Sequence, residues 1–577
     1  MILSRSPICP REGSGTTTIP NKLWSLKAVA DLAMSWLGPV VAIFGGAVAS
    51  GIHPSRGSSV LLDGDNDLLQ VYAFADIVRG PFLLSSDEFG FPNGTNFQLQ
   101  YVESDSITTL LWVLRLLLRD PILAVNCYIL LSFALAFLCF KWMCSRLVSN
   151  PWLLTVLSLV FSWLPSTLIR LSYGHVFLAS TWMIPLALGL ILRSVALAPG
   201  QTRERLVLLL GGLVVGLGTP YFAFFSFCFA LLMFLQQLFS ERRGVRCTDK
   251  TLLGLTGTLV LPSVVKVALS GLFIDERIVR SASSSLAYPG RLHQFFSPIG
   301  FPYLAPDELS SAEPEWFPVP ALVTVGILVA LGRTNLKPNL DRFLRFGILL
   351  GIAIFVYSGL GFMFAVVLSP ALRAWTRIGP FVAALALIVL GVALERFFAA
   401  GGRTIRKLLL GTFLIVSCAL QVVDGRRLIG ASFDAVAAGS FQEPYERALE
   451  QLRITCGDGC PVLMLPFMEL PEGGSVGDVG NGDHLMPGIL SSEFQWSYGA
   501  MKGTRYDDWL ESVRSSDYTQ LAAEARHAGF RVIWVDTRAG DSINFMSIQD
   551  WRRNGASVLG KFGPHVLLDI GEPVLPS

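Results

Sequence analysis

The sequence predicts an α-helical polytopic membrane protein of about eleven spans, followed by a C-terminal extracytoplasmic α/β domain. Hydrophobic residues make up 52% of the 577 residues and charged residues only 15%, against about 25% charged residues in a soluble domain. Apolar runs near spanning length recur over most of the chain. Lys and Arg total 45 against 43 Asp and Glu, a balance that argues against a nucleic-acid partner.

The spans are predicted from hydrophobic windows. They cover residues 30–52, 121–143, 151–169, 176–193, 206–239, 251–274, 318–332, 346–368, 378–399 and 408–423. The window 206–239 is too long for one helix, and Thr219-Pro220 in its middle disfavours helical continuation. We therefore expect two short helices with a tight turn at this position.

The orientation follows from the positions of the basic residues. With residues 1–29 in the cytoplasm, every predicted inner loop carries Lys or Arg, as the positive-inside rule requires. The first apolar run lacks a small-residue cleavage site, so it is predicted to be a retained span. Residues 30–423 then form the transmembrane domain with outer loops at 53–120 and 275–317, and residues 424–577 form a soluble domain on the outer side.

The tail alternates short β-like and helix-like runs, which predicts a small α/β domain. The predicted strands are Val462–Phe467, Arg531–Asp536 and His565–Ile570, and the predicted helices lie near Pro444–Arg453 and Asp517–His527. Cys456 and Cys460 are separated by Gly-Asp-Gly. In an oxidising compartment this spacing predicts a local disulfide. Free thiols and a zinc site are the alternatives, although no second ligand pair follows.

Three carboxylates lie close together after the first span, at Asp63, Asp65 and Asp67. Like charges at this spacing repel and raise one another's proton affinity unless a cation lies among them. One alternative is a solvated turn, because Asp-Gly and Asn-Asp pairs favour turns. A second is a calcium loop, although the terminal Glu of such a loop is missing. The length of the outer loop 53–120 favours a functional role.

Several motifs together resemble the GT-C superfamily of polytopic glycosyltransferases, and more closely its bacterial membrane members that lack firmly assigned substrates. The similarity covers most of the chain, and its motifs are Gly64-Asp65, Phe91-Pro92-Asn93-Gly94, Ser172-Tyr173-Gly174-His175, Leu372-Arg373-Ala374-Trp375-Thr376-Arg377, Val462-Leu463-Met464-Leu465-Pro466-Phe467, Trp496-Ser497-Tyr498-Gly499 and Gly529-Phe530-Arg531-Val532. Each motif alone is short and permissive.

This resemblance implies a membrane glycosyltransferase at the outer face of a bacterial inner membrane. The implied donor is a sugar on a polyprenyl phosphate, and the implied acceptor is a cell-envelope glycan or lipid. An acidic residue of the first outer loop would act as base, which assigns this role to Asp65, with Asp63 and Asp67 as alternatives. A carboxylate with a raised pKa is suited to deprotonating an acceptor hydroxyl.

The leaving lipid phosphate is anionic and needs cationic stabilisation. Arg373 and Arg377 are spaced four apart between two late spans, and at helical spacing both guanidinium groups would reach one phosphate. The alternative is that they extend toward lipid headgroups. A second basic set in the outer loop 275–317 consists of Arg280, Arg291 and His293.

The remaining candidates for substrate binding lie in the outer segments: Glu88, Arg170, Tyr173 and His175. Asp87 and Glu88 would complete a Mg²⁺ or Mn²⁺ site with Asp65, because carboxylate oxygens suit these ions. The spacing does not require a metal, so the divalent cation stays open.

Three other functions are compatible with the same pattern. One is a transporter or flippase of lipid-linked sugars, which would place ionisable residues in mid-membrane, where Lys266 is among the few candidates. Another is a phosphoglycerol-type group transferase, which would use the same base and phosphate-binding groups. The third is a non-catalytic scaffold whose tail binds envelope partners.

Overall fold

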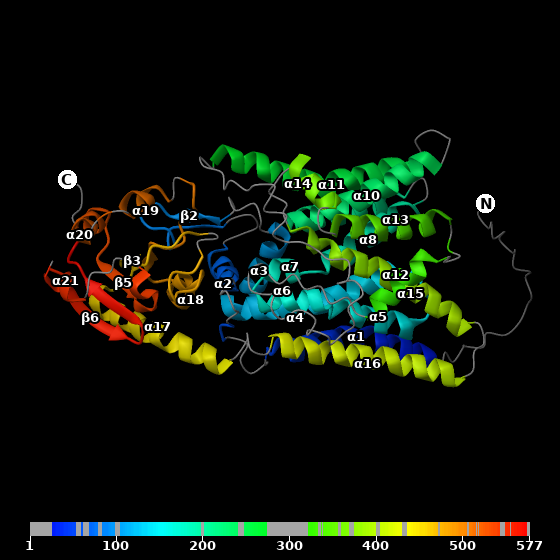
Figure 1. Ribbon diagram of the computed structural model, residues 1–577, viewed down its shortest axis with the longest axis horizontal. Helices are drawn as coiled ribbons and strands as arrows, with labels where there is room; N and C mark the ends of the chain where they lie inside the picture. Colours follow the sequence, from blue (N-terminus) through cyan, green and yellow to red (C-terminus); the bar gives the residue numbers. More distant parts are fainter. Residues whose placement is uncertain are drawn as a thin grey trace, which may run out of the picture.

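The computed structural model describes most of the chain. It covers residues 26–52, 59–61, 68–78, 84–97, 104–197, 201–240, 247–273, 321–332, 336, 338–355, 359–367, 374–399, 404–429, 435–470, 474–504, 507–514, 516, 518–542, 548–553 and 555–573. The molecule is elongated, with a bundle of long helices along most of its length and a part built around a β-sheet at one end (Figure 1).

The bundle contains a helix in every window in which the sequence predicts a span. Its helices are α1 (Leu26–Ser50), α4 (Pro121–Cys144), α5 (Pro151–Ser162), α6 (Pro165–Ser172), α7 (Val176–Ala179), α8 (Met183–Ser194), α9 (Thr202–Gly216), α10 (Pro220–Ser240), α11 (Cys247–Phe273), α12 (Ala321–Leu331), α13 (Pro338–Phe355), α14 (Leu360–Val367), α15 (Gly379–Ala399) and α16 (Thr404–Ile429). Within the described residues, four helical stretches are long and apolar enough to cross a membrane: Pro121–Cys144, Pro151–Ser172, Pro220–Phe239 and Trp375–Ala399. The total of eleven spans stays a prediction.

Caps and prolines determine where several of these helices begin. The carboxylate of Asp120 accepts hydrogen bonds from the backbone N–H groups of Ile122 and Leu123 at 2.9 and 3.1 Å, and α4 then starts with proline, whose missing N–H costs nothing at this position. The long window 206–239 is divided as predicted, because α9 ends at Gly216 and α10 begins at Pro220.

The window 346–368 does not form the single helix that the sequence predicts. Helix α13 begins earlier, at Pro338, and ends at Phe355, and α14 is a separate short helix. The first turn of α13 is polar, with Asp341 and Arg345 paired at 3.0 Å. A hydropathy window therefore misses this turn, although proline favours a helix start there.

The first outer loop contains regular structure that the sequence analysis did not predict. It forms α2 (Leu68–Ile77), a hairpin of β1 (Ser85–Ser86) and β2 (Thr95–Asn96), and α3 (Asp105–Leu118). Helix α2 is largely buried, with contacts to α3 and α4 on one side and to α18 (Met486–Leu490) on the other. Helices α2 and α3 are both shorter than a membrane span, so a search for spanning segments does not find them.

The C-terminal part contains a five-stranded sheet in the order β4-β3-β5-β7-β6. Its strands are β3 (Pro461–Leu465), β4 (Gln495–Trp496), β5 (Val532–Asp536), β6 (Ser557–Phe562) and β7 (His565–Asp569), and its longer helices are α17 (Ala435–Cys456), α19 (Asp508–Val513), α20 (Tyr518–His527) and α21 (Ile548–Arg553). Strand β3 runs parallel to β4 and β5, whereas β7 is antiparallel to its two neighbours. Strands β3, β5 and β7 and helices α17 and α20 match predicted elements.

The two faces of this sheet pack against different parts of the molecule. On one face, Met464, Trp496 and Trp534 belong to the same hydrophobic core as the helical bundle. On the other face, residues such as Leu463 and Ile533 form a second, smaller core with α19, α20 and α21. Alternation along the strands separates the two sets. The inner face of the sheet is therefore continuous with the core of the bundle.

A segment of the first outer loop extends the sheet beyond β4. The Trp496 N–H donates to the Glu88 carbonyl oxygen at 2.7 Å, and the Phe91 N–H donates to the Trp496 carbonyl oxygen at 3.0 Å. Phe89 pairs in parallel with Trp496 and is fully buried. The hydroxyl of Thr95 donates to the Gly499 carbonyl oxygen at 2.7 Å. These bonds attach the outer loop directly to the C-terminal part.

Candidate functional site

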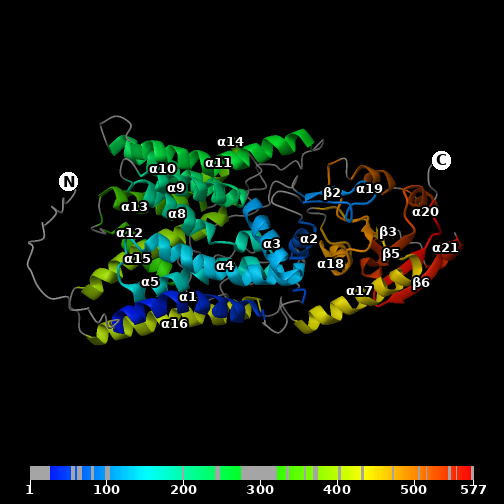
Figure 2. The same ribbon diagram turned by 180° about the vertical axis from the view of Figure 1, so that it is seen from behind.

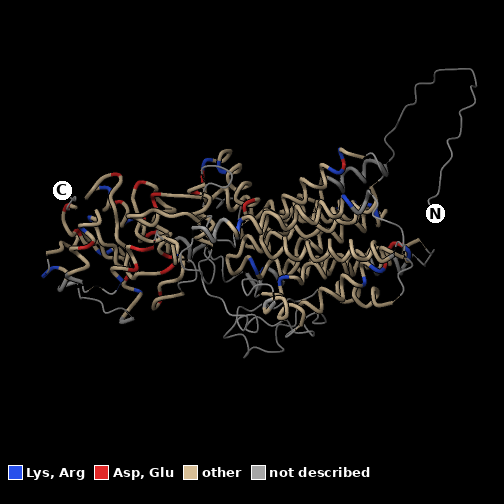
Figure 3. The backbone as a smooth tube through the Cα atoms, turned by 90° about the horizontal axis from the view of Figure 1, so that it is seen from above, with Lys and Arg blue, Asp and Glu red and all other residues tan. Residues whose placement is uncertain are grey.

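The junction between the bundle and the sheet is the candidate functional site. Figures 1 and 2 show α2 between the two parts of the molecule, where the helices of the bundle end. Charged residues lie mainly at the two ends of the bundle and in the C-terminal part, whereas the middle of the bundle is almost free of them among the residues described (Figure 3). The predicted base Asp65 and its neighbours Asp63 and Asp67 lie outside the described residues, directly before α2.

Both sides of this acidic stretch are joined by one buried hydrogen-bond network. The hydroxyl of Tyr72, on α2, donates to Asn126 Oδ1 on α4 at 2.7 Å and accepts from the Leu61 N–H at 3.2 Å. Asn126 Nδ2 donates to the Ser59 carbonyl oxygen at 3.0 Å. Tyr72 is 0% exposed and Asn126 1% exposed. Residues on both sides of the three carboxylates are therefore fixed to the same end of the bundle.

In the predicted group, Arg170 lies in the last turn of α6, and Tyr173 and His175 lie on the turn between α6 and α7. The structure brings the three together. An Nη1 of Arg170 lies 3.3 Å from His175 Nδ1, and the rings of Tyr173 and His175 are 6.3 Å apart. Gly174 has a φ of +68°, which favours glycine. The turn adjoins α2, because a phenylalanine of α7 stacks on one of α2 with centroids 6.2 Å apart.

Arg377 is half-buried against an aromatic ring. Its guanidinium carbon lies 4.2 Å from the ring centroid of Tyr221, at the start of α10, and the Tyr221 hydroxyl accepts a hydrogen bond from the Ala374 N–H at 3.3 Å. This geometry is that of a cation–π contact. Arg373, Arg280, Arg291 and His293 lie outside the described residues.

The helical spacing proposed for Arg373 and Arg377 is wrong. Arg377 lies on a short 3-10 helix that begins only at Trp375, and Ala374 before it has φ −93° and ψ 78°. This backbone is not helical, so no helix runs from position 373 to Arg377.

The ionisable residue that the sequence places inside a span is paired. Lys266, on α11, forms an ion pair with Asp105 at 3.2 Å, and Asp105 begins α3 at the junction. A second pair joins Arg115 of α3 to Asp76 of α2, also at 3.2 Å. These pairs connect the two helices of the first outer loop to each other and to the bundle.

Asp87 and Glu88 lie on the hairpin at the edge of the sheet. The Glu88 backbone N–H donates to Ser86 Oγ at 3.0 Å, and its carbonyl oxygen accepts from β4. In the part of the chain that the structure describes, no three His, Cys, Asp or Glu side chains are grouped to hold a metal. Asp65, the third proposed ligand, lies outside that part, so the proposed Mg²⁺ or Mn²⁺ site stays untested.

Cys456 and Cys460 form a disulfide with a Cα–Cα distance of 5.9 Å. The bond closes the turn between the end of α17 and the start of β3. The Gln495 N–H donates to the Cys460 carbonyl oxygen at 3.1 Å, so the turn also contacts β4. The disulfide lies at the C-terminal end of α17, which points away from the bundle (Figure 1).

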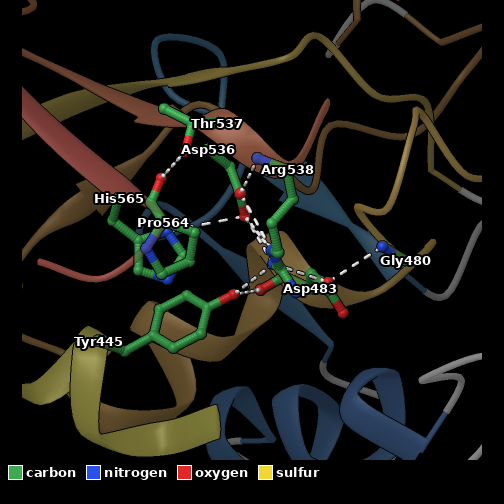
Figure 4. Close-up of polar contacts among 8 residues, drawn as sticks. All are labelled: Tyr445, Gly480, Asp483, Asp536, Thr537, Arg538, Pro564 and His565. Carbon is green, nitrogen blue, oxygen red and sulfur yellow. Dashed lines mark hydrogen bonds and ion pairs between the residues drawn. The ribbon is translucent and has the colours of Figure 1, made fainter. Parts of the chain in front are cut away.

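The sequence analysis missed a buried charge cluster in the C-terminal part, shown in Figure 4. Arg538 donates to Asp536 Oδ2 at 2.6 Å and to the hydroxyl of Tyr445 at 3.2 Å, and it pairs with Asp483 Oδ2 at 2.8 Å. The ring of His565 lies 4.1 Å from that of Tyr445. The cluster joins α17, β5 and β7 to the 3-10 turn Asp483–Leu485, which contacts α2.

Burial governs the protonation of this cluster. Desolvation lowers the pKa of His484 and of His565 to about 4. Burial alone would raise the pKa of Asp536, but the hydrogen bonds and charge of Arg538 hold it below its ordinary value. In this cluster the guanidinium of Arg538 pairs with the carboxyl groups of both Asp483 and Asp536. At neutral pH the nearby His484 and His565 are uncharged. Asp536 is the last residue of the fully buried strand β5, and Arg538 lies two residues beyond it. A charged pair at the end of an apolar strand was the available sequence signal.

The fold defined by this bundle, its buried outer helix and its C-terminal sheet is GT-C-like, as in two solved membrane transferases. The chain is similar to arabinofuranosyltransferase AftD from Mycobacteria, with a TM-score of 0.54 and 13% identity over 93% of this chain and 40% of AftD. It therefore spans less than half the length of AftD. The chain is also similar to ArnT from Cupriavidus metallidurans bound to undecaprenyl phosphate, with a TM-score of 0.52 and 13% identity. The similarity covers 94% of this chain and 100% of ArnT.

The sequence comparisons add a family match without a function. A family model for a domain of unknown function (DUF6311) matches residues 58–318, a little under half of the chain. The match begins with the first outer loop and ends with the second predicted outer loop. No curated protein sequence matches the chain. At the identities found, the similarity to solved structures shows the fold.

Proposed function

We propose that this protein is a membrane glycosyltransferase that moves a sugar from a polyprenyl-phosphate donor to a cell-envelope glycan or lipid. The reaction would take place at the outer face of a bacterial inner membrane, with the N-terminus in the cytoplasm and the C-terminal part outside. The GT-C-like fold supports this class of reaction, and ArnT, which shares the fold over its whole length, is bound to undecaprenyl phosphate.

The observation that carries the proposal is the buried network of Tyr72 and Asn126, which holds residues on both sides of the acidic stretch at the junction. A carboxylate close to this junction would meet a donor phosphate at the membrane edge and an acceptor from the outer side. We assign the base to Asp65, with Asp63 and Asp67 as alternatives. A solvated surface turn would not need both of its ends fixed by buried side chains.

In the proposed reaction, Asp65 removes the proton of an acceptor hydroxyl as its oxygen attacks the anomeric carbon of the donor sugar. The bond from that carbon to the phosphate oxygen breaks, and the polyprenyl phosphate leaves with the electron pair. The anomeric configuration inverts. The leaving phosphate is already ionised, so cationic side chains serve it better than a general acid.

Basic residues of the predicted outer segments are the proposed phosphate ligands. Arg377 is the described member, half-buried beside Tyr221. We propose Arg373, Arg280, Arg291 and His293 as the others, on the basis of their outer position in the sequence. Glu88, Arg170, Tyr173 and His175 are proposed to contact the sugar or the acceptor, because the turn that carries the last three adjoins α2.

The test is to compare envelope glycans from host cells with and without the gene by mass spectrometry, and then to restore the gene as wild type or as Asp65→Asn. We expect a mass difference of one sugar residue, which the wild type restores and the variant does not. Asp63→Asn and Asp67→Asn test the alternatives. A phosphoglycerol mass difference, or full restoration by all three variants, contradicts the proposal.

A transporter of lipid-linked sugars predicts a different result. Purified protein mixed with a lipid-linked sugar fraction and an envelope glycan and lipid fraction as acceptor, both from host cells, would then release no free undecaprenyl phosphate. A transferase releases it in proportion to sugar transferred.

A further inference from the structure

We propose that Tyr72 and Asn126 are positioning residues for the acidic stretch of the first outer loop. This inference rests on the proposed function, because it assigns a role to two residues beside the proposed base. Neither residue is charged, and neither is a candidate acid or base. Their contribution would be geometric.

Among the described residues, three hydrogen bonds form the network. Tyr72 donates to Asn126 across the contact between α2 and α4, which fixes α2 on the bundle. The same tyrosine hydroxyl accepts from the Leu61 N–H, and Asn126 donates to the Ser59 carbonyl oxygen. The side chains of Tyr72 and Asn126 therefore bind the backbone of residues 59–61, before the acidic stretch, and also join α2, after it, to α4.

Burial makes these bonds specific. Val60 and Leu61 are buried, and Leu68 and Leu69, at the start of α2, are 0% exposed. A backbone N–H and a backbone carbonyl in such surroundings need partners. No secondary structure supplies them, because residues 59–61 lie in neither a helix nor a strand. Tyr72 and Asn126 supply them instead.

The short distance along the chain makes the fixation effective. Only residues 62–67 separate Leu61 from the first residue of α2, and both borders are fixed to α4 through Tyr72 and Asn126. The two borders therefore keep fixed positions relative to α4. A displacement of about 1 Å between a base and its substrate costs roughly a hundredfold in rate.

The variants for the test are Tyr72→Phe, Asn126→Leu and their combination, which remove the polar atoms and keep the buried volume. The matched control is Tyr128→Phe. Tyr128 lies on the same helix as Asn126, is also 0% exposed, and has a hydroxyl bonded to Ser180 at 2.6 Å and to Trp182 at 3.2 Å. Its hydrogen bonds do not involve residues 59–61.

The measurements use the full chain purified in detergent. The rate of undecaprenyl phosphate release is measured with the lipid-linked sugar fraction and the host envelope acceptor fraction both at saturation. Undecaprenyl phosphate binding is measured by native mass spectrometry. Backbone hydrogen exchange is followed in peptides that cover residues 59–61. We expect Tyr72→Phe and Asn126→Leu to lower the rate on the order of 10- to 100-fold, with phosphate binding within about twofold of wild type. The double variant should be no slower than the slower single variant, and exchange at residues 59–61 should become faster.

Tyr128→Phe should leave both the rate and the exchange at residues 59–61 near wild type. An equal loss of rate in Tyr128→Phe would overturn the inference, because the effect would then be general loss of core packing. Wild-type rate in Tyr72→Phe, together with no activity in Asp65→Asn, would overturn the positioning role alone. Full activity in Asp63→Asn, Asp65→Asn and Asp67→Asn would overturn the proposed base, and the positioning role with it.

Discussion

Trp496 and Glu88 are joined by a backbone hydrogen bond of 2.7 Å, from the N–H of the first to the carbonyl oxygen of the second. This bond adds a segment of the first outer loop to the edge of a sheet that lies near the other end of the sequence. An unpaired sheet edge accepts any available strand. In this protein the edge at β4 is occupied by the loop that also carries the acidic stretch, so the C-terminal part and the proposed active site share one framework.

The Thr95 hydroxyl strengthens this attachment. We expect Thr95→Val to destabilise the protein by about 1–3 kcal/mol, because it leaves the buried Gly499 carbonyl oxygen without its hydroxyl donor. Thermal unfolding in detergent measures the effect. Thr537→Val is the control, since the hydroxyl of Thr537 donates to a carbonyl oxygen at an exposed position and its loss should cost less than about 0.5 kcal/mol. Equal effects would show that the loop attachment contributes nothing specific.

Arg377 is expected to hold the donor phosphate. Arg377→Ala should weaken undecaprenyl phosphate binding about tenfold, because a half-buried guanidinium beside Tyr221 pairs with phosphate better than an exposed one. Native mass spectrometry at varied lipid concentration measures this change. Arg396→Ala, at the other end of α15, should bind as wild type does. Unchanged binding in Arg377→Ala would favour the alternative in which this arginine only contacts lipid headgroups.

The buried cluster around Arg538 should tolerate loss of its cation poorly. In Arg538→Met, the carboxylates of Asp483 and Asp536 would remain buried without a counter-charge. Breaking a buried ion pair in this way costs about 3–5 kcal/mol. Limited proteolysis should then cut the C-terminal part of the variant at protease concentrations that leave wild type intact. Arg447→Met is the control, because Arg447 forms an exposed pair within α17. Equal protection of both variants would contradict a stabilising role for the cluster.

The two buried histidines make the stability of the protein depend on pH. His484 and His565 have pKa values of about 4 in the folded protein against an ordinary 6.5, so between these values the unfolded chain binds more protons. Stability therefore falls as the pH is lowered from about 6.5 to about 4, by about 3 kcal/mol for each histidine. The lowered pKa of Asp536 acts in the same direction at still lower pH.

His484→Leu tests this pH dependence. The variant should show a shallower loss of melting temperature between pH 6.5 and pH 4 than wild type, because one of the two linked protonations is removed. His527→Leu is the control, since His527 ends α20 outside this cluster. An unchanged slope in His484→Leu would show that folding does not lower the pKa of His484.

The disulfide should contribute modestly to stability. It encloses only the turn from Cys456 to Cys460, and a loop of this length corresponds to about 2 kcal/mol in the chain-entropy estimate. The double variant Cys456→Ser/Cys460→Ser should melt a few degrees lower and keep its transfer activity. Mass spectrometry after alkylation should find both thiols blocked only when the wild type is first reduced. Loss of transfer activity in the double variant would place the turn closer to the chemistry than we describe.

The helices of the bundle and several elements of the C-terminal part follow from local patterns. Long apolar runs, prolines at helix starts and alternation in the tail determine them, and α10 begins at Pro220 as predicted. Helix α2 was not predicted, because its burial depends on α18, which lies far away in the sequence.

The site depends even more on distant partners. Tyr72 lies in a long loop and Asn126 lies within a predicted span. No local sequence pattern marks either residue as part of a site. Their significance comes from the packing of α2 on α4, which brings both to Leu61. The pairing of Asp483 with Arg538 likewise arises from a chain reversal that no local pattern shows. For Arg377 the local pattern gave a wrong prediction. Its four-residue spacing from Arg373 suggested one helix, but the short helix that carries Arg377 begins only at Trp375.

The pairing of Phe89 with Trp496 also sets an order of assembly during synthesis. The outer-loop segment leaves the ribosome early, whereas β4 is made only after every helix of the bundle. The junction therefore cannot close until the last part of the protein has been translated and brought to the same side of the membrane. A chain that stops short of β4 would leave the segment from Glu88 to Phe91 without its strand partner.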